Sequence, residues 1–390
     1  MNDGVYKKFR GEYRLNPDPL TCNCVILPDG TIAQCTDIAL HLRYLRQAMS
    51  LESLKQIGTF FQGWKPFDLK VSDSGKKAVL SYNGKQVTEV SFPAKSHFYE
   101  QRTSSGLPFL GNAVLQGVDT VAFQSLWPCE VARAGYSCQF CYTGGISEQL
   151  AKKQKAEPKM PTFTDAAEIV DYAVNNEKMA EYIQITGGST MNPQAECETI
   201  SRLLKEIDSV AGLKNIRGEV LVFTTPPTDP KMLDKVFDAG ADRIACSLEV
   251  WDEKLAETIT PGKVKYTSRK RHVDALKYIA KEYGPNKACS TFVVGLEPVE
   301  IFLQGAEALA KDGIVAMASL WIPFGRPVMG SAKAPGLEYY QRVKQGLAEI
   351  YEKYGIVPPG GQGFNVDIDK DIWQHREEVL NSKSEPILVT

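Results

Sequence analysis

Apolar residues from about residue 116 onward fall into short continuous runs, and a segment with helical periodicity follows each run. Short runs of this kind are typical of strands buried on both faces of a parallel sheet. The alternation therefore predicts an α/β fold built from βα units. A complete barrel of this type has eight units, so six units predict a partial (β/α)6 barrel of the TIM type. The predicted strands span residues 120–126, 182–188, 219–226, 243–250, 288–295 and 314–323.

The first 115 residues have a different pattern, in which short alternating segments are separated by turn signals. Pro-Asp-Gly at 28–30 and Tyr-Asn-Gly at 82–84 stand between alternating runs, as in β-hairpins. A helical pattern covers 36–62. We therefore expect three parts along the chain. They are an N-terminal α+β domain of unknown role (1–115), the barrel core (116–335), and a C-terminal helix with a covering tail (336–390).

Composition and charge exclude several classes of partner. The 390 residues carry a formal net charge of −2, with no long run of one sign, so we expect neither nucleic acid nor an anionic membrane surface as a partner. The sequence has no run of eighteen apolar residues, so no membrane span is predicted. The first residues lack the apolar core of a signal peptide, so we expect a cytoplasmic protein. In such a chain, nine cysteines indicate reduced thiols or metal ligands.

Three of these cysteines form a compact motif on the loop that is predicted to follow the first parallel strand. Cys129, Cys138 and Cys141 are spaced C-x8-C-x2-C, and Phe140 directly precedes the last one. Parallel barrels bind ligands at the carboxyl ends of their strands. Four thiolates are the rule for a closed iron–sulfur cluster, whereas three leave one iron position open for a small molecule. The alternative is a structural zinc or closed cluster site with a fourth ligand from elsewhere in the chain.

The other predicted strand ends carry glycine and polar residues that would collect on the same face. The residues concerned are Gly187, Gly188 and Ser189 at the end of the second strand, Glu249 at the end of the fourth, Gly295 and Glu297 at the end of the fifth, and Trp321 at the end of the sixth.

This arrangement resembles the radical S-adenosylmethionine (SAM) superfamily. Its usual signature is C-x3-C-x2-C after the first strand of a partial (β/α)6 barrel, with an aromatic residue before the third cysteine. Cys138, Phe140 and Cys141 match the second half of that signature. The first half differs, because Ala134 occupies the expected position and the nearest upstream cysteine is Cys129. Longer first spacings occur in some branches of the superfamily.

The stretch from about 219 to 335 resembles the branch that contains biotin synthase, methylornithine synthase and the radical SAM maturases of iron-only hydrogenase. The resemblance implies a [4Fe–4S] cluster on the three cysteines, chelated by SAM. It implies reductive cleavage of SAM to a 5′-deoxyadenosyl radical, which takes hydrogen from an amino-acid-like or cofactor-precursor small molecule. A flavodoxin- or ferredoxin-type electron donor and oxygen sensitivity are implied as well. The implied SAM contacts are Phe140, Gly187, Gly188, Ser189, Glu249, Arg271 (or Arg269), Gly295, Glu297 and Trp321.

Several of these residues have a simpler structural interpretation. The carboxylates of Glu249 and Glu297 could cap nearby helices or pair with an arginine, and Arg269 and Arg271 could lie on a solvated helix face. Buried thiols such as Cys197, Cys246 and Cys289 are expected to be packing residues.

A second group of cysteines, Cys22, Cys24 and Cys35, brackets the first predicted hairpin. The turn could bring the three thiols together as an auxiliary iron–sulfur or iron site, or they could simply pack in a small core. An auxiliary cluster would suit a sulfur-inserting radical SAM enzyme, which is one alternative function. The other alternative is a non-enzymatic iron–sulfur or zinc protein.

Two absences narrow the chemistry further. The N-terminal region lacks the D-x-H-x-x-G motif and the βα alternation of a cobalamin domain, so no cobalamin is expected. The tail lacks the cysteine-rich segment of peptide-modifying relatives, which favours a small-molecule substrate.

Overall fold

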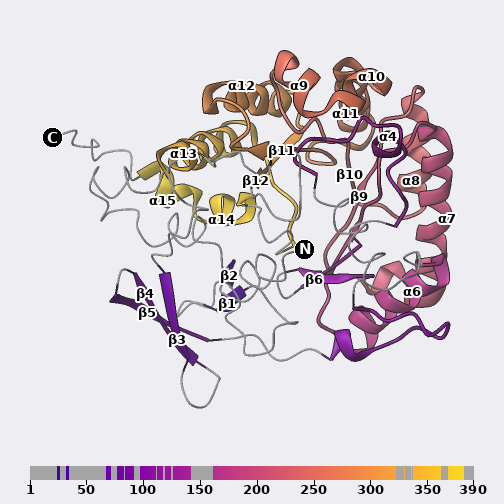
Figure 1. Cartoon of the computed structure of the whole chain (residues 1–390), viewed down its shortest axis with the longest axis horizontal. Coiled ribbons are helices and arrows are strands. Elements are labelled where there is room, and N and C mark those ends of the chain that lie inside the picture. The colour runs from indigo at the N-terminus through magenta and orange to yellow at the C-terminus, as the bar shows by residue number, and fades with distance from the viewer. Residues whose placement is uncertain are drawn as a thin grey trace.

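The main body of the protein is a curved seven-stranded sheet with helices along one face (Figure 1). The structure is a computed structural model that describes residues 24–26, 32–34, 67–71, 77–82, 84–91, 97–110, 112–116, 119–123, 126–141, 161–321, 329, 335, 337–361 and 368–381. The strand order is β12-β11-β10-β9-β8-β7-β6. The strands are β6 (Val114–Gln116), β7 (Thr120–Phe123), β8 (Tyr182–Ile185), β9 (Val220–Phe223), β10 (Arg243–Ala245), β11 (Ala288–Val294) and β12 (Val315–Leu320).

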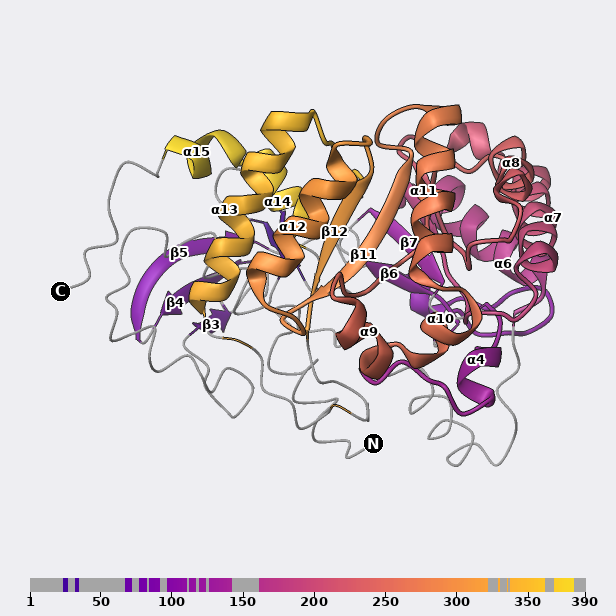
Figure 2. The same ribbon diagram turned by 90° about the horizontal axis from the view of Figure 1, so that it is seen from above.

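All neighbours from β7 to β12 are parallel, and β6 adds an antiparallel strand at the β7 edge. Each of the six predicted strands is present, so the partial (β/α)6 barrel is confirmed. Figure 2 shows the helices following the outside of the sheet. They are α6 (Phe163–Asp171), α7 (Pro193–Ala211), α8 (Asp234–Asp238), α11 (Arg269–Tyr283), α12 (Val299–Ala310) and α13 (Leu337–Tyr354).

Local sequence fixes where these helices start. Thr162 and Asp165 form a capping box at the start of α6, in which each side chain bonds the backbone N–H of the other residue. Asn192 caps α7, and Pro193 follows at the first helical position, where a missing N–H costs nothing. The outward-facing strand residues pack on these helices, as Phe292 does edge-to-face on Phe302 at 5.6 Å.

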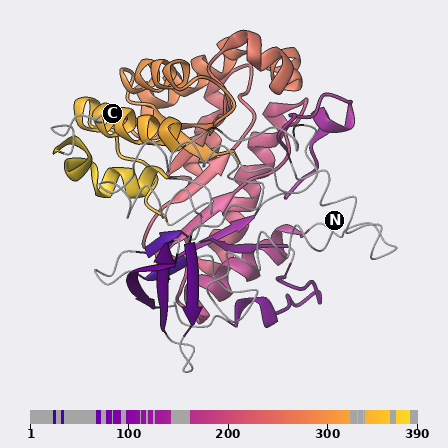
Figure 3. The same ribbon diagram turned by 60° about the vertical axis from the view of Figure 1, so that its left-hand side comes forward.

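A second, antiparallel sheet of five strands lies in the N-terminal part, as a separate layer from the barrel sheet (Figure 3). Its order is β2-β1-β5-β4-β3. The two predicted hairpins are confirmed by the β1–β2 and β4–β5 pairings, and Gly84 takes the positive φ (78°) of the second turn. The helix expected over 36–62 lies outside the described residues. The strands are β1 (Cys24–Ile26), β2 (Ile32–Gln34), β3 (Phe67–Val71), β4 (Lys77–Tyr82) and β5 (Lys85–Ser91).

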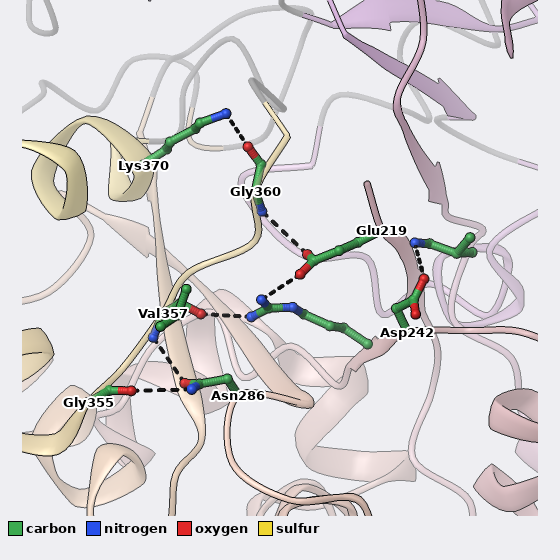
Figure 4. Close-up of polar contacts among 9 residues, drawn as sticks. Glu219, Asp242, Asn286, Gly355, Val357, Gly360 and Lys370 are labelled. Atoms are coloured by element: carbon green, nitrogen blue, oxygen red, sulfur yellow. Dashed lines mark hydrogen bonds and ion pairs between the residues drawn. The ribbon is translucent and has the colours of Figure 1, made fainter. Parts of the chain in front are cut away.

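The chain after α13 crosses the amino ends of the barrel strands (Figure 4). Arg243, the first residue of β10, donates to Glu219 and to the carbonyl oxygen of Val357, both at 2.7 Å. The N–H of Gly360 donates to the other oxygen of Glu219 at 3.4 Å. Residues 356–361 therefore cover this end of the barrel, opposite the end that carries the predicted site.

The free edge of β12 is also covered. The N–H of Ala318 donates to both carboxylate oxygens of Asp369 at 3.0 and 2.9 Å, and the hydroxyl of Tyr351 donates to the same carboxylate at 2.7 Å. Asp369 begins α14 (Asp369–Gln374), which leads into α15 (Arg376–Asn381). The edge thus offers fewer open donors to another strand.

Within the described part of the chain, every helix is too short or too polar to pass through a bilayer. The three-part division of the chain and its cytoplasmic location stay predictions.

Candidate metal centre

The three motif cysteines lie together on the loop that follows β7. Cys129 precedes the short helix α4 (Glu130–Arg133), and its sulfur accepts the N–H of Ala132 at 3.4 Å. Burial raises the pKa of Cys138 to about 12; the charge of Lys263 lowers it, and charges on Glu249, Cys141 and Cys129 raise it. The Cys138 thiol therefore lies close enough to both other cysteines to respond to their charge.

Contacts from three directions fix the loop between Cys138 and Cys141. The N–H of Gln139 donates to the carbonyl of Ile259 at 2.9 Å, and its own carbonyl accepts the N–H of Met329 at 3.0 Å. The ring of Phe140 packs against Val293 of β11 and Trp321 just after β12. The loop after the first parallel strand is thus tied to segments that follow the last ones.

The glycines after β8 allow the cysteine loop to approach. A β-carbon on Gly188 would lie 2.2 Å from the backbone nitrogen of Cys129, and one on Gly187 would lie 1.8 Å from the indole of Trp127. The indole N–H of Trp127 donates to the Gly188 carbonyl at 2.8 Å, and the carbonyl of Ser189 accepts the N–H of Glu130 at 3.0 Å. These glycines are therefore required for packing on the cysteine loop. Their contact with SAM stays a prediction.

Glu249 forms a largely buried ion pair with a residue that the sequence did not single out. Its carboxylate lies 2.6 Å from the ammonium of Lys263, which also donates to the Ser247 carbonyl at 2.6 Å. Lys263 belongs to α10 (Pro261–Tyr266), a short helix between β10 and α11. Glu249 has φ of +72°, which is uncommon for a residue with a side chain. Of the two structural alternatives for Glu249, the structure shows pairing with a cation, here a lysine.

Glu297 has the capping contacts that were its alternative interpretation. Its carboxylate is buried and accepts the N–H groups of Trp251 and Asp252 at 2.9 Å. It thereby holds the start of α9 (Glu253–Ile259). Burial raises the pKa of Glu297, although the two backbone hydrogen bonds oppose this rise.

The two candidate arginines differ in how far their donors are used. Arg269 stacks over Trp251 at 3.7 Å, pairs with Glu253 at 3.3 Å and donates to the Trp251 carbonyl. Arg271 reaches toward the loop after β9, where its Nη1 lies 3.4 Å from the Thr228 hydroxyl. Its Nε is buried without a hydrogen-bond partner, which makes it rare among the described side chains. Arg271 therefore has a donor to spare for an anion, and Arg269 is committed to the protein.

The remaining predicted residues, Gly295 and Trp321, lie at the carboxyl ends of β11 and β12. Gly295 has φ of +109°, and a β-carbon there would lie 3.2 Å from that of Trp321. Its N–H donates to the hydroxyl of Tyr339 at 2.9 Å, and that hydroxyl donates to the Glu297 carbonyl at 2.9 Å. The turn at Gly295 is thus tied to α13 and lies beside Trp321.

The other cysteines divide into two groups. Cys197, Cys246 and Cys289 are buried among core residues, as expected for packing thiols. Cys24 lies in β1 opposite Gln34, while Cys22 and Cys35 lie outside the described residues. The auxiliary site therefore stays a prediction.

The described residues include no group of three or more His, Cys, Asp or Glu side chains set around a single metal ion. A cluster distributes its thiolates over separate irons, so its ligands stand farther apart than those of one zinc. The donor set of three thiols on one loop, with a buried cation beside them, fits such a cluster.

A cavity of about 550 Å³ lies between α9, α10 and α11, with Lys263 and His272 in its wall. His272 is buried, and its Nδ1 lies 2.8 Å from the Ser268 carbonyl. Burial, aided by the charge of Lys263, lowers the pKa of His272 to about 3, so the ring is neutral near pH 7.

Comparison with known proteins agrees with this geometry. Residues 133–301 match the family model of the radical SAM superfamily. A curated relative, bacteriochlorophyllide c C-7(1)-hydroxylase of Chlorobaculum limnaeum, is 23% identical over 263 residues, which make up 65% of each protein. The chain thus spans less than two thirds of the length of that relative.

Solved structures of radical SAM proteins are similar at lower identity. Methylornithine synthase is 14% identical with a TM-score of 0.44, covering 78% of this chain and 71% of its own. The hydrogenase maturase HydG is 14% identical with a TM-score of 0.42, covering 51% of this chain and 45% of its own. A radical SAM methyltransferase from Sphaerobacter thermophilus is 16% identical with a TM-score of 0.41, covering 82% and 86%.

The matched residues include Cys138 and Cys141 and four of the six parallel strands, β8 to β11. This family implies a [4Fe–4S] cluster and SAM as cofactors, and the non-enzymatic alternative is therefore set aside. Residues 133–301 thus match the radical SAM superfamily, and this match together with the curated relative supports an enzyme.

Proposed function

We propose that this enzyme binds a [4Fe–4S] cluster through Cys129, Cys138 and Cys141, cleaves SAM reductively and abstracts hydrogen from a small-molecule substrate. The observation that carries the proposal is the position of the three thiols. They share one loop at the carboxyl end of the first parallel strand, and Gly188 packs directly on Cys129. A cluster held by these three thiols would supply one-electron reduction of bound SAM, and so the means of hydrogen abstraction from the substrate.

The residues of this chain would bind and orient SAM around that position. Arg271 is suited to the carboxylate, because its buried Nε lacks a partner and a guanidinium pairs well with a carboxylate. Phe140 and Trp321 offer an apolar wall next to the cysteine loop. The packing of Gly188 on Cys129 holds the glycine loop beside the first cysteine, and the backbone of this loop would receive the SAM amino group.

The proposal extends to the class of substrate and the type of reaction. We infer an amino-acid-like or cofactor-precursor substrate, an external flavodoxin- or ferredoxin-type donor and no cobalamin. A second candidate reaction is hydroxylation, favoured by the curated relative that is named for hydroxylating bacteriochlorophyllide c.

The test is an anaerobic reconstitution with iron and sulfide, followed by SAM and dithionite. We expect about four irons per chain and formation of 5′-deoxyadenosine. Both should be lost in Cys138→Ala and kept in Cys197→Ala, a matched control at a buried cysteine of α7. A chain that binds zinc, or a cluster whose spectrum SAM leaves unchanged, would contradict the proposal. An iron count near eight would support an auxiliary cluster and the sulfur-inserting alternative.

A further inference from the structure

Lys263 lies beside the cysteine loop. Of the lysines there that the structure describes, it is the only one whose ammonium forms a buried ion pair. Its side chain is 16% exposed and that of its partner Glu249 is 13% exposed, so both charges are largely removed from water. Desolvation of two charges costs several kcal/mol, which close contact must offset. Burial works against the ammonium, but the charges of Glu249 and Cys138 outweigh it, so the pKa of Lys263 lies above its ordinary value.

Packing prevents this ammonium from withdrawing. Gly262 lies so close to the cysteine loop that a β-carbon there would be 1.9 Å from Cγ1 of Val131 and 2.5 Å from the Tyr136 carbonyl. The next residue, Lys263, is then held by its two hydrogen bonds to Glu249 and Ser247. The helix α10 therefore fixes a positive charge next to the loop.

The neighbours of Lys263 show where that charge acts. Besides Glu249, the ionisable groups that interact with it are the thiols of Cys138 and Cys246 and the neutral ring of His272. Cys246 is a buried core thiol, whereas Cys138 belongs to the cluster motif. Four residues before Lys263, the carbonyl of Ile259 accepts the N–H of Gln139 at 2.9 Å, so this stretch packs on the segment that carries Cys138. A reduced cluster held there would add negative charge near Lys263.

We propose that Lys263 is a positioning residue of the cluster site: its ammonium, fixed beside the cysteine loop, stabilises the negative charge that the cluster gains on reduction. The inference rests on the proposed function, because it requires a cluster on Cys138. It predicts that removing the charge makes the cluster harder to reduce, since Glu249 is then left as an unbalanced anion nearby.

The test measures iron and sulfide per chain and the midpoint potential of the SAM-free cluster, titrated with dithionite and followed by electron paramagnetic resonance. In Lys263→Met we expect a lower potential, equivalent to at least about a tenfold fall in the ratio of reduced to oxidised cluster at fixed potential. Lys263→Arg should keep both loading and potential. Lys265→Met is the matched control, because it removes a charge from the same helix. The exposed Lys265 side chain also contacts the cysteine loop, where its ammonium lies 3.7 Å from the centre of the Tyr136 ring.

The double variant Lys263→Met/Glu249→Gln keeps the test decisive if the single variant loses its cluster. It removes both charges, so we expect most of the loading and potential to return. An unchanged midpoint potential in Lys263→Met overturns the inference. A fall in loading and potential in Lys263→Arg as large as that in Lys263→Met, with an unchanged circular dichroism spectrum, overturns it as well. If those results accompany a wild type that binds its cluster and cleaves SAM, only the role of Lys263 is wrong. A wild type without a cluster overturns both proposals.

Discussion

Gly188 lies against Cys129 so closely that a β-carbon at residue 188 would come within 2.2 Å of the Cys129 nitrogen and α-carbon. Backbone cannot yield to such a contact as a flexible side chain can. The first cysteine of the motif is thus positioned by a glycine about sixty residues farther along the chain, on the loop after the next parallel strand.

Gly188→Ala should therefore displace Cys129 and lower cluster loading. We expect well under half of the wild-type iron per chain after reconstitution, together with a loss of 5′-deoxyadenosine. The control is Gly284→Ala, at a helix end with φ of +95° and no neighbour within 4 Å of the added carbon. That variant carries backbone strain without touching the loop, so it should keep its iron. Full loading of Gly188→Ala would contradict the packing argument.

Arg271→Met should weaken SAM binding to the cluster-loaded protein by about tenfold or more, because it removes a charge-assisted hydrogen bond to the carboxylate. Equilibrium dialysis with labelled SAM measures the effect. Lys270→Met is the matched control, since this neighbouring side chain is 84% exposed and pairs only with Asp274 among the described residues. Equal dissociation constants for both variants would remove Arg271 from the site.

Arg243→Met should lower the free energy of unfolding by about 3–5 kcal/mol, because it leaves the Glu219 carboxylate and the Val357 carbonyl without their buried donor. The exposed pair of Arg217 and Glu181 provides the comparison, and Arg217→Met should cost less than about 1 kcal/mol. Urea unfolding gives both values. Iron loading should be unchanged in any folded fraction of Arg243→Met, since this pair lies at the opposite end of the strands.

Asp165 should make stability depend on pH in the acid range. Burial tends to raise the pKa of Asp165, but hydrogen bonds from Ser105, Thr103 and Thr162 outweigh it, so the pKa lies well below its usual range. A carboxylate with a lowered pKa contributes stability that is complete above its unfolded value, about 3.9, and is lost as the pH falls through the folded value.

Asp165→Asn should then cost about 2 kcal/mol at pH 7, and this difference from wild type should shrink below about pH 4. Urea titrations at several pH values measure it. The control is Glu168→Gln on the same helix, whose carboxylate binds Ser104 at the surface, and it should change stability by about 0.5 kcal/mol or less. A cost that stays constant down to pH 3 would show that Asp165 acts without its charge.

The sequence predicts the barrel well because strands buried on both faces need continuous apolar runs, and each run here is followed by a helical pattern. The position of the cysteine loop was predictable for a related reason, since its three thiols lie close together in sequence after the first strand. Lys263 was not, because a second lysine, Lys265, stands two residues away and no pattern distinguishes the two. Its role depends on the approach of α10 through Gly262, and such tertiary contacts between distant segments leave no periodic signal.

The same limit applies to the carboxylates. Glu249 and Glu297 both follow strands, and the resemblance to the radical SAM superfamily implied a SAM contact for each. Their actual partners, a lysine on α10 and two backbone N–H groups before α9, are set by how the chain folds after β10. Sequence position therefore predicted that these side chains lie at the carboxyl ends of the strands, but it did not predict the partner of each side chain.

The cover over the amino ends of the strands has a consequence for biosynthesis. Arg243 bonds a carbonyl that is 114 residues farther along the chain. While the ribosome makes that intervening stretch, the guanidinium has no Val357 to bind, and the amino ends of the nascent barrel strands stay open to water. We expect the last step of folding to wait for this segment to emerge, so chaperones would meet a barrel that is complete in its strands but still uncovered.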